Sequence, residues 1–329
     1  MLIGVGAALL KLPIATHDPV TWLEAAFTAT SAVTVTGLTV VETGSQFTLF
    51  GQIVILLLIQ LGGLGLMTFA VLTAAALGFN LGLSMQRVSR HALNQVSMAV
   101  GRRTWLSIAT FALVVESIGL MVLAIFFVPE KGWQSGLYHA LFYSISGFNN
   151  VGFSLSADSV GGYAASAGIS LTVSILFIIG GLGYIVAREL YEKRSFSRLS
   201  FYSRIILIAT VLFNLAAMIG FFLLEHDNPH TLGQFDSIGE TLLASWFQGT
   251  TPRTAGFHTV DISMLGAGTS VMMLLLMFIG GAPNSTASGI KLTTFFILIA
   301  ATRSFLRGHL KVGLFHRSIA SEAVLKALA

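Results

Sequence analysis

A lone glycine follows a short apolar stretch three times in this chain, at Gly37, Gly152 and Gly256. The short stretches run over residues 22–33, 136–146 and 238–247. Each is predicted to be a helix too short to cross a bilayer, which needs about 20 apolar residues. We therefore expect three re-entrant segments, each of which enters the membrane as a helix, turns at a glycine and returns.

A long apolar segment with a glycine pair follows each lone glycine. The pairs are Gly62–Gly63, Gly180–Gly181 and Gly280–Gly281. The intervals 37 to 62, 152 to 180 and 256 to 280 are similar, at 25, 28 and 24 residues. Matched spacing of this kind indicates one internally repeated unit.

The composition is that of a polytopic membrane protein. Apolar residues make up 54% of the 329 residues and charged residues 10%, whereas about a quarter of a soluble domain is charged. The net charge of +4 comes from basic residues in the linkers between apolar segments, so we expect no nucleic-acid partner. The absence of cysteine from the sequence excludes disulfides and thiolate metal sites.

Several apolar segments are long enough to span a membrane. The predicted spans cover residues 52–79, 105–128, 169–187 and 205–224. Residues 1–12 are interpreted as the last turns of a further spanning helix. The segment 270–302 is predicted to be a broken helix, because residues 280–289 (GGAPNSTASG) disfavour helix. Irregular backbone at membrane depth occurs only where it lines a cavity or is buried in protein, which predicts a functional role.

Charge indicates the orientation of the units. Three basic linkers hold 13 of the 18 Lys and Arg residues, and they lie on one side if each unit is helix, re-entrant loop, helix. That side is predicted to be cytoplasmic. Ten of the 14 acidic residues fall in or beside the opposite loops, which would raise the local cation concentration.

A re-entrant helix that ends at a glycine suits a dehydrated cation. Its carboxyl end carries the negative end of the helix dipole, and the extended backbone beyond can present carbonyl oxygens. Glycine reaches the required dihedral angles without strain. Any one of these motifs could be an ordinary turn between helices, but three copies at matched spacing favour a cation pathway.

Three motifs resemble those of a known family. They are TSAVTVTGL at 30–38, with QLGGLG at 60–65, then SGFNNVGF at 146–153 and TPRTAGF at 251–257. In this order they resemble the Trk/Ktr/HKT superfamily of cation transporters, and within it most closely the KtrB-type membrane subunits. The resemblance covers nearly the whole chain.

The resemblance implies an all-α membrane protein of repeated helix, pore-loop, helix units in a pseudo-fourfold arrangement, with three units present. We assign residues 1–84 to the first unit, 85–195 to the second, 196–310 to the third with its broken inner helix, and 311–329 to a linker and the start of a fourth. Because the rest of the fourth unit is missing, the sequence is expected to be a fragment or a defective product, with its first helix clipped.

The resemblance also assigns a selectivity filter and a gating loop. The filter, which binds potassium through its backbone, comprises Val35, Thr36, Gly37, Asn150, Val151, Gly152, Thr254, Ala255 and Gly256. The intramembrane gating loop comprises Gly280, Gly281, Ser285, Thr286, Ser288, Gly289 and Lys291. In related plant transporters a serine at the position of Gly37 accompanies sodium preference, so Gly37 favours potassium.

The implied function is sodium-dependent potassium uptake across the plasma membrane by a multi-pass protein. Potassium is the substrate, sodium is an activator, and no cofactor is expected in this chain. The implied partners are a second copy of the chain in a homodimer, membrane lipid and a cytosolic ring of nucleotide-binding regulatory subunits. Since no motif here resembles a nucleotide site, regulation must come from that partner.

Other polar residues have more than one interpretation. Glu116 inside a predicted span either pairs with a neighbouring helix or handles ions. Arg253 is expected to brace its loop through carbonyl groups, and Lys291 either holds the gating loop or ends it. Of Asn149 and Asn150, one is expected to line the filter and the other to cap the helix. The loop histidines His17, His226 and His258 are expected to be solvated.

The alternative function is a secondary transporter with discontinuous helices that moves another monovalent cation, such as sodium, by alternating access. Such halves are related by inversion, whereas these repeats all run the same way. An enzyme is less favoured, because the sequence shows no paired carboxylates, metal-spaced histidines or serine nucleophile elbow.

Overall fold

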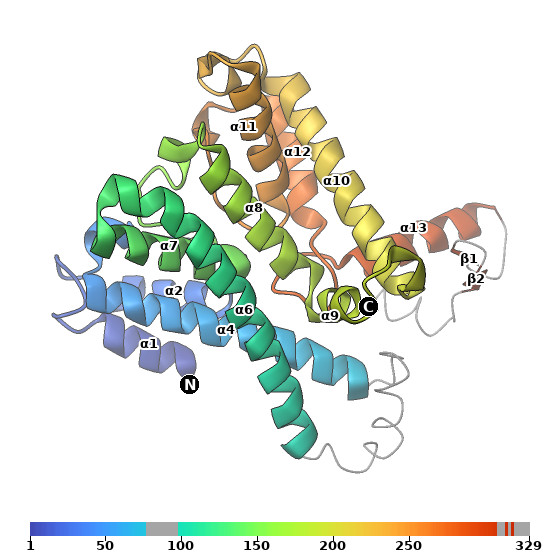
Figure 1. The fold of residues 1–329 in the computed structure, drawn as a ribbon, viewed down its shortest axis with the longest axis horizontal. Coiled ribbons are helices and arrows are strands. Elements are labelled where there is room, and N and C mark those ends of the chain that lie inside the picture. Colours follow the sequence, from blue (N-terminus) through green and yellow to red (C-terminus); the bar gives the residue numbers. More distant parts are fainter. Residues whose placement is uncertain (77–97, 308–312, 315–316, 319–329) are drawn as a thin grey trace.

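A computed structural model describes residues 1–76, 98–307, 313–314 and 317–318, and these form an almost entirely helical protein (Figure 1). The α-helices are α1 (Leu2–Leu10), α2 (Trp22–Val33), α3 (Thr43–Gln46), α4 (Leu49–Ala76), α6 (Met98–Lys131), α7 (Trp133–Phe148), α8 (Ala167–Leu182), α9 (Tyr184–Lys193), α10 (Phe201–Glu225), α11 (Ile238–Thr250), α12 (Ala267–Phe278) and α13 (Leu292–Leu306). Two residue pairs, β1 (Gly313–Leu314) and β2 (Arg317–Ser318), pair antiparallel.

Among the described residues, three helices are long and apolar enough to cross a membrane, at Leu49–Val71, Arg103–Lys131 and Phe201–Glu225. They confirm three of the predicted spans as helices, although residues 77–79 of the first lie outside the described part. Only 28% of the apolar stretch of α6 and of α10 is buried inside the protein. The remaining apolar side chains face outward, as expected for helices whose solvent is lipid.

The predicted single span over 169–187 is wrong in one respect, because a bend interrupts it. Helix α8 ends at Leu182, and α9 leaves at 97° to it. Gly183 between them has a φ of +79°, and a Cβ there would lie 2.7 Å from the carbonyl oxygen of Asn284. The bend therefore depends on a segment about 100 residues away, which the local apolar pattern does not reveal.

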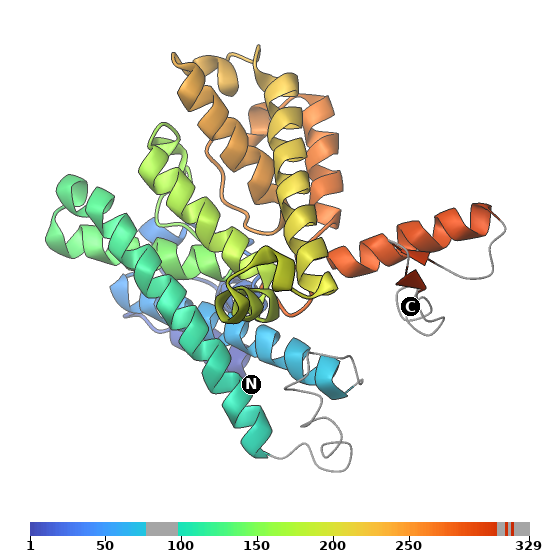
Figure 2. The same ribbon diagram turned by 45° about the vertical axis from the view of Figure 1, so that its right-hand side comes forward.

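The predicted break after residue 278 is confirmed. Helix α12 ends at Phe278, α13 begins at Leu292, and residues 279–291 between them, here called the 279–291 loop, are not helical. The loop is closed at its base, since the Gly280 amide donates to the Ile290 carbonyl at 3.0 Å and the Ile290 amide donates to Phe278 at 3.1 Å. Helix α13 projects from the rest of the protein (Figure 2).

The three predicted short helices are α2, α7 and α11, with 12, 16 and 13 residues. Helix α2 has the predicted bounds and begins with a capping box between Thr21 and Glu24. Helix α7 begins three residues earlier than predicted, and α11 ends three residues later. Helix α2 packs against α1 and α4, α7 against α6 and α8, and α11 against α10 of its own unit and α8 of the second unit (Figure 1).

The basic linkers are only partly described. Arg87 and Arg90 of the first linker and Lys311 of the third lie outside the described residues. In the second linker, Glu189 of α9 accepts hydrogen bonds from Lys193 and from the Ser200 amide, the latter at 2.8 Å. It also accepts from the hydroxyls of Ser200 and Ser203, at the start of α10. This carboxylate therefore joins α9 to the amino end of α10.

At the other end of α10, hydrogen bonds to the Glu225 carboxylate hold the start of α12 in place. The Glu225 side chain is fully buried and accepts hydrogen bonds from the Gly266 amide at 2.9 Å, from the Thr231 hydroxyl at 2.7 Å and from the Thr269 hydroxyl. Asn228 donates to the same carboxylate at 2.6 Å. A negative charge at a helix amino end is also favoured by the helix dipole.

We expect Glu225→Ala to lower the free energy of unfolding by about 3 kcal/mol, because the buried Thr231 and Thr269 hydroxyls lose their acceptor. Thermal unfolding in detergent measures this change. Asp236→Ala, which removes an exposed carboxylate in the following loop, is the control and is expected to have little effect. Equal unfolding temperatures for the two variants would contradict the stabilising role of the Glu225 hydrogen bonds.

Candidate functional site

The three lone glycines, more than 100 residues apart in sequence, meet in space. A Cβ on Gly37 would lie 1.6 Å from the Val151 carbonyl oxygen. A Cβ on Gly152 would lie 3.0 Å from the Cα of Gly256. The loops that carry them, here called the first (34–38), second (149–153) and third (253–257) glycine loops, therefore converge on one place.

These contacts explain why each loop carries glycine. Gly37, Gly152 and Gly256 have φ angles of +80°, +82° and +80°, in the region where a side chain causes strain. At Gly37 and Gly152 the neighbouring loop also leaves no room for a Cβ. The predicted importance of these positions thus has both a conformational and a steric cause.

The residues before each glycine turn their amides back towards the short helix. The Thr36 amide donates to the Ser31 carbonyl at 2.9 Å, and the Val151 amide donates to Ser146 at 3.1 Å. In the third loop, the Ala255 amide donates to Thr251 at 2.9 Å. The first and second loops therefore share this backbone geometry, with a bond over five residues, whereas the bond of the third loop spans four.

The carbonyl oxygens of the same three residues, Thr36, Val151 and Ala255, accept no hydrogen bond from the described part of the chain. Helices α2, α7 and α11 end just before these loops, so the negative ends of their dipoles point towards them. Carbonyl oxygens and helix carboxyl ends together provide partners for a cation.

The predicted filter residues therefore lie in three adjoining loops. Val35 and Asn150 also have a left-handed φ of 57° each, whereas Thr254 has a φ of −167°. The third loop thus reaches its glycine by a different backbone path from the other two.

Two hydroxyl groups that form hydrogen bonds across the loops were not predicted from the sequence. The Ser146 hydroxyl donates to the Phe153 carbonyl at 2.8 Å, and the Thr251 hydroxyl donates to Phe257 at 2.7 Å. Each bond spans a glycine loop and holds its two ends together. The signal was a hydroxyl residue six positions before the glycine in the first and second copies and five before it in the third.

The first glycine of each early pair makes room for a carbonyl group. A Cβ on Gly62 would lie 2.2 Å from the Val33 carbonyl oxygen, and one on Gly180 would lie 2.0 Å from that of Phe148. Val33 and Phe148 are the last residues of α2 and α7. The third pair differs, because a Cβ on Gly280 would meet the Ser288 carbonyl within the 279–291 loop.

The 279–291 loop lies against the bend between α8 and α9. The Ala282 amide donates to the Gly181 carbonyl at 2.9 Å, and the Tyr184 amide donates to Asn284 at 3.3 Å. Of the predicted gating residues, Gly280, Gly281, Ser285 and Thr286 are buried, whereas Ser288 and Gly289 are exposed. Lys291 donates its ammonium group to the Ala287 carbonyl, so it holds the loop internally.

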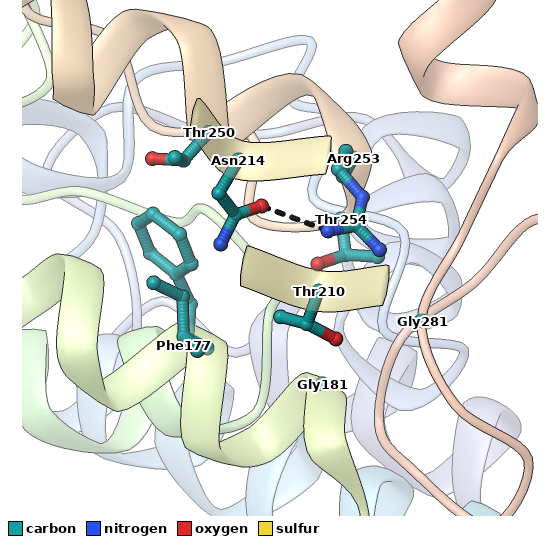
Figure 3. A pocket seen from close by; sticks show the side chains of 9 residues that line it. Phe177, Gly181, Thr210, Asn214, Thr250, Arg253, Thr254 and Gly281 are labelled. Atoms are coloured by element: carbon teal, nitrogen blue, oxygen red, sulfur yellow. Dashed lines mark hydrogen bonds between the residues drawn. The ribbon is translucent and has the colours of Figure 1, made fainter. Parts of the chain in front are cut away.

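Arg253 of the third glycine loop is buried beside the 279–291 loop (Figure 3). It donates to the Gly280 carbonyl at 3.1 Å and to the Asn214 side-chain oxygen of α10 at 2.8 Å. As expected, it braces through a carbonyl, but the carbonyl belongs to the 279–291 loop. A cavity of about 20 Å³, large enough for one water molecule, lies beside it between Thr250, Thr254 and Phe177.

Glu116 pairs with neighbouring elements. Its carboxylate accepts from the Gln60 amide of α4 at 3.0 Å and from the Asn149 amide at 3.1 Å. Asn149 is the C-cap residue of α7, and its side chain also donates to the Gln60 oxygen at 3.0 Å. The Asn150 side chain instead bonds to Thr286 and Thr254. The cluster therefore anchors the carboxyl end of α7 to two long helices.

Beyond the third glycine loop, His258 is half-buried, although the sequence suggested a solvated histidine. Burial lowers its pKa, whereas the negative charges of Asp158 and Asp261 act in the opposite direction.

The described residues contain no group of three or more His, Cys, Asp or Glu side chains suited to a metal ion.

Comparison with known proteins gives consistent matches. The family model for the cation transport protein TrkH matches residues 5–329. The Ktr system potassium uptake protein B of Bacillus subtilis is 45% identical over 329 residues, which cover 100% of this chain and 74% of that protein. The potassium/sodium uptake protein NtpJ of Enterococcus hirae is 35% identical over 330 residues, with coverage of 100% and 73%.

A solved structure shares the fold. The crystal structure of the potassium transporter TrkH from Vibrio parahaemolyticus matches with a TM-score of 0.69 and 20% sequence identity. The match covers 100% of this chain and 65% of that one, so this chain spans just under two thirds of its length. The helical fold of repeated units predicted from the sequence is confirmed.

We expect Gly180→Ala to destabilise the protein by about 1–3 kcal/mol or more, because the new methyl group would overlap the Phe148 carbonyl and displace α7. Gly181→Ala is a matched control, since its Cβ would meet only ordinary contacts at 3.9 Å. Thermal unfolding of both variants in detergent provides the comparison. A smaller loss for Gly180→Ala than for Gly181→Ala would refute the carbonyl-clearance explanation.

Proposed function

The chain belongs to the TrkH family of cation transport proteins, and we propose from this premise that it takes up potassium ions through a pore whose selectivity filter consists of the three glycine loops. It is a multi-pass membrane protein, and its relatives are transporters and not enzymes. The plasma membrane is the proposed location, in agreement with the uptake role named for the relatives.

The convergence of Gly37, Gly152 and Gly256 carries this proposal. Just before each glycine, beyond the carboxyl end of a short helix, lies a carbonyl oxygen that has no hydrogen-bond donor among the described residues. In the filter, these oxygens replace the hydration shell of a potassium ion. The proposed filter residues are Val35, Thr36, Gly37, Asn150, Val151, Gly152, Thr254, Ala255 and Gly256.

The ions are proposed from the names of the relatives together with Gly37. The Bacillus subtilis relative is a potassium uptake protein, and the Enterococcus hirae relative is a potassium/sodium uptake protein. Potassium is therefore the proposed substrate, and sodium is the proposed activator. Glycine at the first filter position is the feature of this chain that favours potassium.

The 279–291 loop is proposed as the gate, with Gly280, Gly281, Ser285, Thr286, Ser288, Gly289 and Lys291 as its working residues. The buried positions of Gly280, Gly281, Ser285 and Thr286 and the break between α12 and α13 support this role.

The proposed repeat boundaries remain 1–84, 85–195 and 196–310, with 311–329 as a linker and the start of a fourth unit. They agree with the contacts of α2 with α4, of α7 with α6 and α8, and of α11 with α10.

Partners are proposed from the naming of relatives as parts of a Ktr system, which implies a separate component. We propose a cytosolic nucleotide-binding ring as that component and a homodimer as the assembly. The outward-facing apolar side chains of α6 and α10 would contact lipid.

Gly37→Ser in the complete protein is expected to reduce the preference for potassium over sodium at least several-fold. The side chain would strain a left-handed residue and push against the Val151 carbonyl, which displaces filter oxygens of two loops. Rubidium uptake with sodium as competitor, in cells that lack other potassium uptake, measures the preference.

Gly132→Ser is the matched control for this experiment. Gly132 has a φ of +79°, so serine there costs similar backbone strain, but no atom lies within 4 Å of its Cβ position and it is far from the filter. We expect this variant to keep the wild-type preference. An unchanged preference in Gly37→Ser would refute the filter assignment.

A further inference from the structure

We propose that the side chains of Asn150 and Arg253 couple the 279–291 loop to the second and third glycine loops, so that the position of the loop sets the ion selectivity of the filter. This inference rests on the proposed function. It assigns to two residues of the glycine loops a positioning role that is separate from any contact with the ion.

The Asn150 side chain joins three segments. Its amide donates to the Thr286 hydroxyl of the 279–291 loop at 2.8 Å, although 136 residues separate the two. Its oxygen accepts from the Thr254 hydroxyl of the third glycine loop at 2.7 Å. One buried side chain therefore connects the second loop to the third and both to the 279–291 loop.

Asn150 suits this position because of its backbone as well as its side chain. Its φ is 57°, a left-handed value that asparagine tolerates better than most residues. The same amide also donates to the Phe148 carbonyl at the end of α7, at 3.2 Å. Movement of Thr286 would therefore act directly on the residue that sets the direction of the second glycine loop.

Arg253 makes the second connection. Its two terminal nitrogens reach the Gly280 carbonyl and Asn214, and its side chain is only 6% exposed. No carboxylate within the described part of the chain forms an ion pair with it. Two neutral oxygens and the Phe213 ring, whose centroid lies 5.5 Å from the guanidinium carbon, hold this buried cation, so the loss of the Gly280 carbonyl would leave it poorly compensated.

Both connections depend on one position of the 279–291 loop. The loop itself is held by the bend of α8 and α9, where the Thr286 amide donates to the Gly180 carbonyl at 3.4 Å. If the loop moves away, Asn150 and Arg253 both lose hydrogen bonds, which destabilises the observed positions of the second and third glycine loops. By reciprocity, ions that stabilise the filter geometry also favour the observed loop position.

Thr286→Val tests the coupling, because it keeps the side-chain shape and removes the hydroxyl that Asn150 contacts. The variant also loses the bond that this hydroxyl donates to the Phe148 carbonyl at 3.3 Å, at the end of α7 and beside Asn150. We expect the ratio of rubidium to sodium uptake by the complete protein in cells to fall about threefold to tenfold, in line with the loss of these buried hydrogen bonds. Thr286→Ser, which retains the hydroxyl, is expected to restore the wild-type ratio.

Thr172→Val is the matched control. It makes the same substitution in α8, where the hydroxyl donates to the Gly168 carbonyl of its own helix at 2.6 Å. Its ion ratio is expected to stay at the wild-type value. A ratio in Thr286→Val that equals that of Thr172→Val would overturn the coupling.

A double-mutant cycle supplies a second test. Thr254→Val removes the other hydroxyl that contacts Asn150. Because both hydroxyls act through one side chain, the double variant is expected to lose no more selectivity than the more affected single variant. Losses that simply multiply would contradict the coupling. If Thr286→Val does not fold, Thr286→Ala removes the same hydroxyl and carries the same expectations.

The proposed function can fail separately from the coupling. Wild-type protein that shows neither rubidium uptake nor discrimination against sodium would refute the function, and the coupling with it. Wild-type protein that takes up rubidium selectively, beside a Thr286→Val variant with an unchanged ratio, would refute the coupling alone.

Discussion

The arrangement of the short helices depends on three backbone carbonyl groups, those of Thr36, Val151 and Ala255, which accept no hydrogen bond from the described part of the chain. Short helices lead into the loops that carry these groups, glycines allow the backbone angles of the loops, and the hydroxyls of Ser146 and Thr251 link the two ends of the second and third loops. Gly62 and Gly180 let α2 and α7 approach the long helices closely enough for the loops to meet. Carbonyl oxygens in this arrangement suit a cation, which is the basis of the proposed filter.

The sequence predicted the parts of the fold that repeat. The short helices, the lone glycines and the break after Phe278 depend on local composition and spacing, so they could be found without coordinates. The bend at Gly183 could not, because the backbone that packs against it belongs to Asn284, far along the chain. Sequence patterns indicate helices from neighbouring residues, whereas this bend lies at a tertiary contact between two units.

The polar network of the site was hidden for the same reason. Glu116, Arg253 and Asn150 could each be identified as unusual, but their partners lie 33 to 136 residues away, or are backbone groups. Hydroxyl and amide side chains in apolar segments have many possible partners, and only packing selects among them. The sequence therefore predicted where polar residues matter more reliably than what they contact.

The glycine pairs show how one repeated position can come to serve two kinds of packing. In the first two units the first glycine of the pair serves dense packing, and a Cβ there would collide with the carbonyl group at the end of a short helix. In the third unit the same position instead closes the base of an irregular loop, because Gly280 lies against Ser288. Divergence of one copy after duplication has thus moved the same tight contact from between two helices to within a single segment.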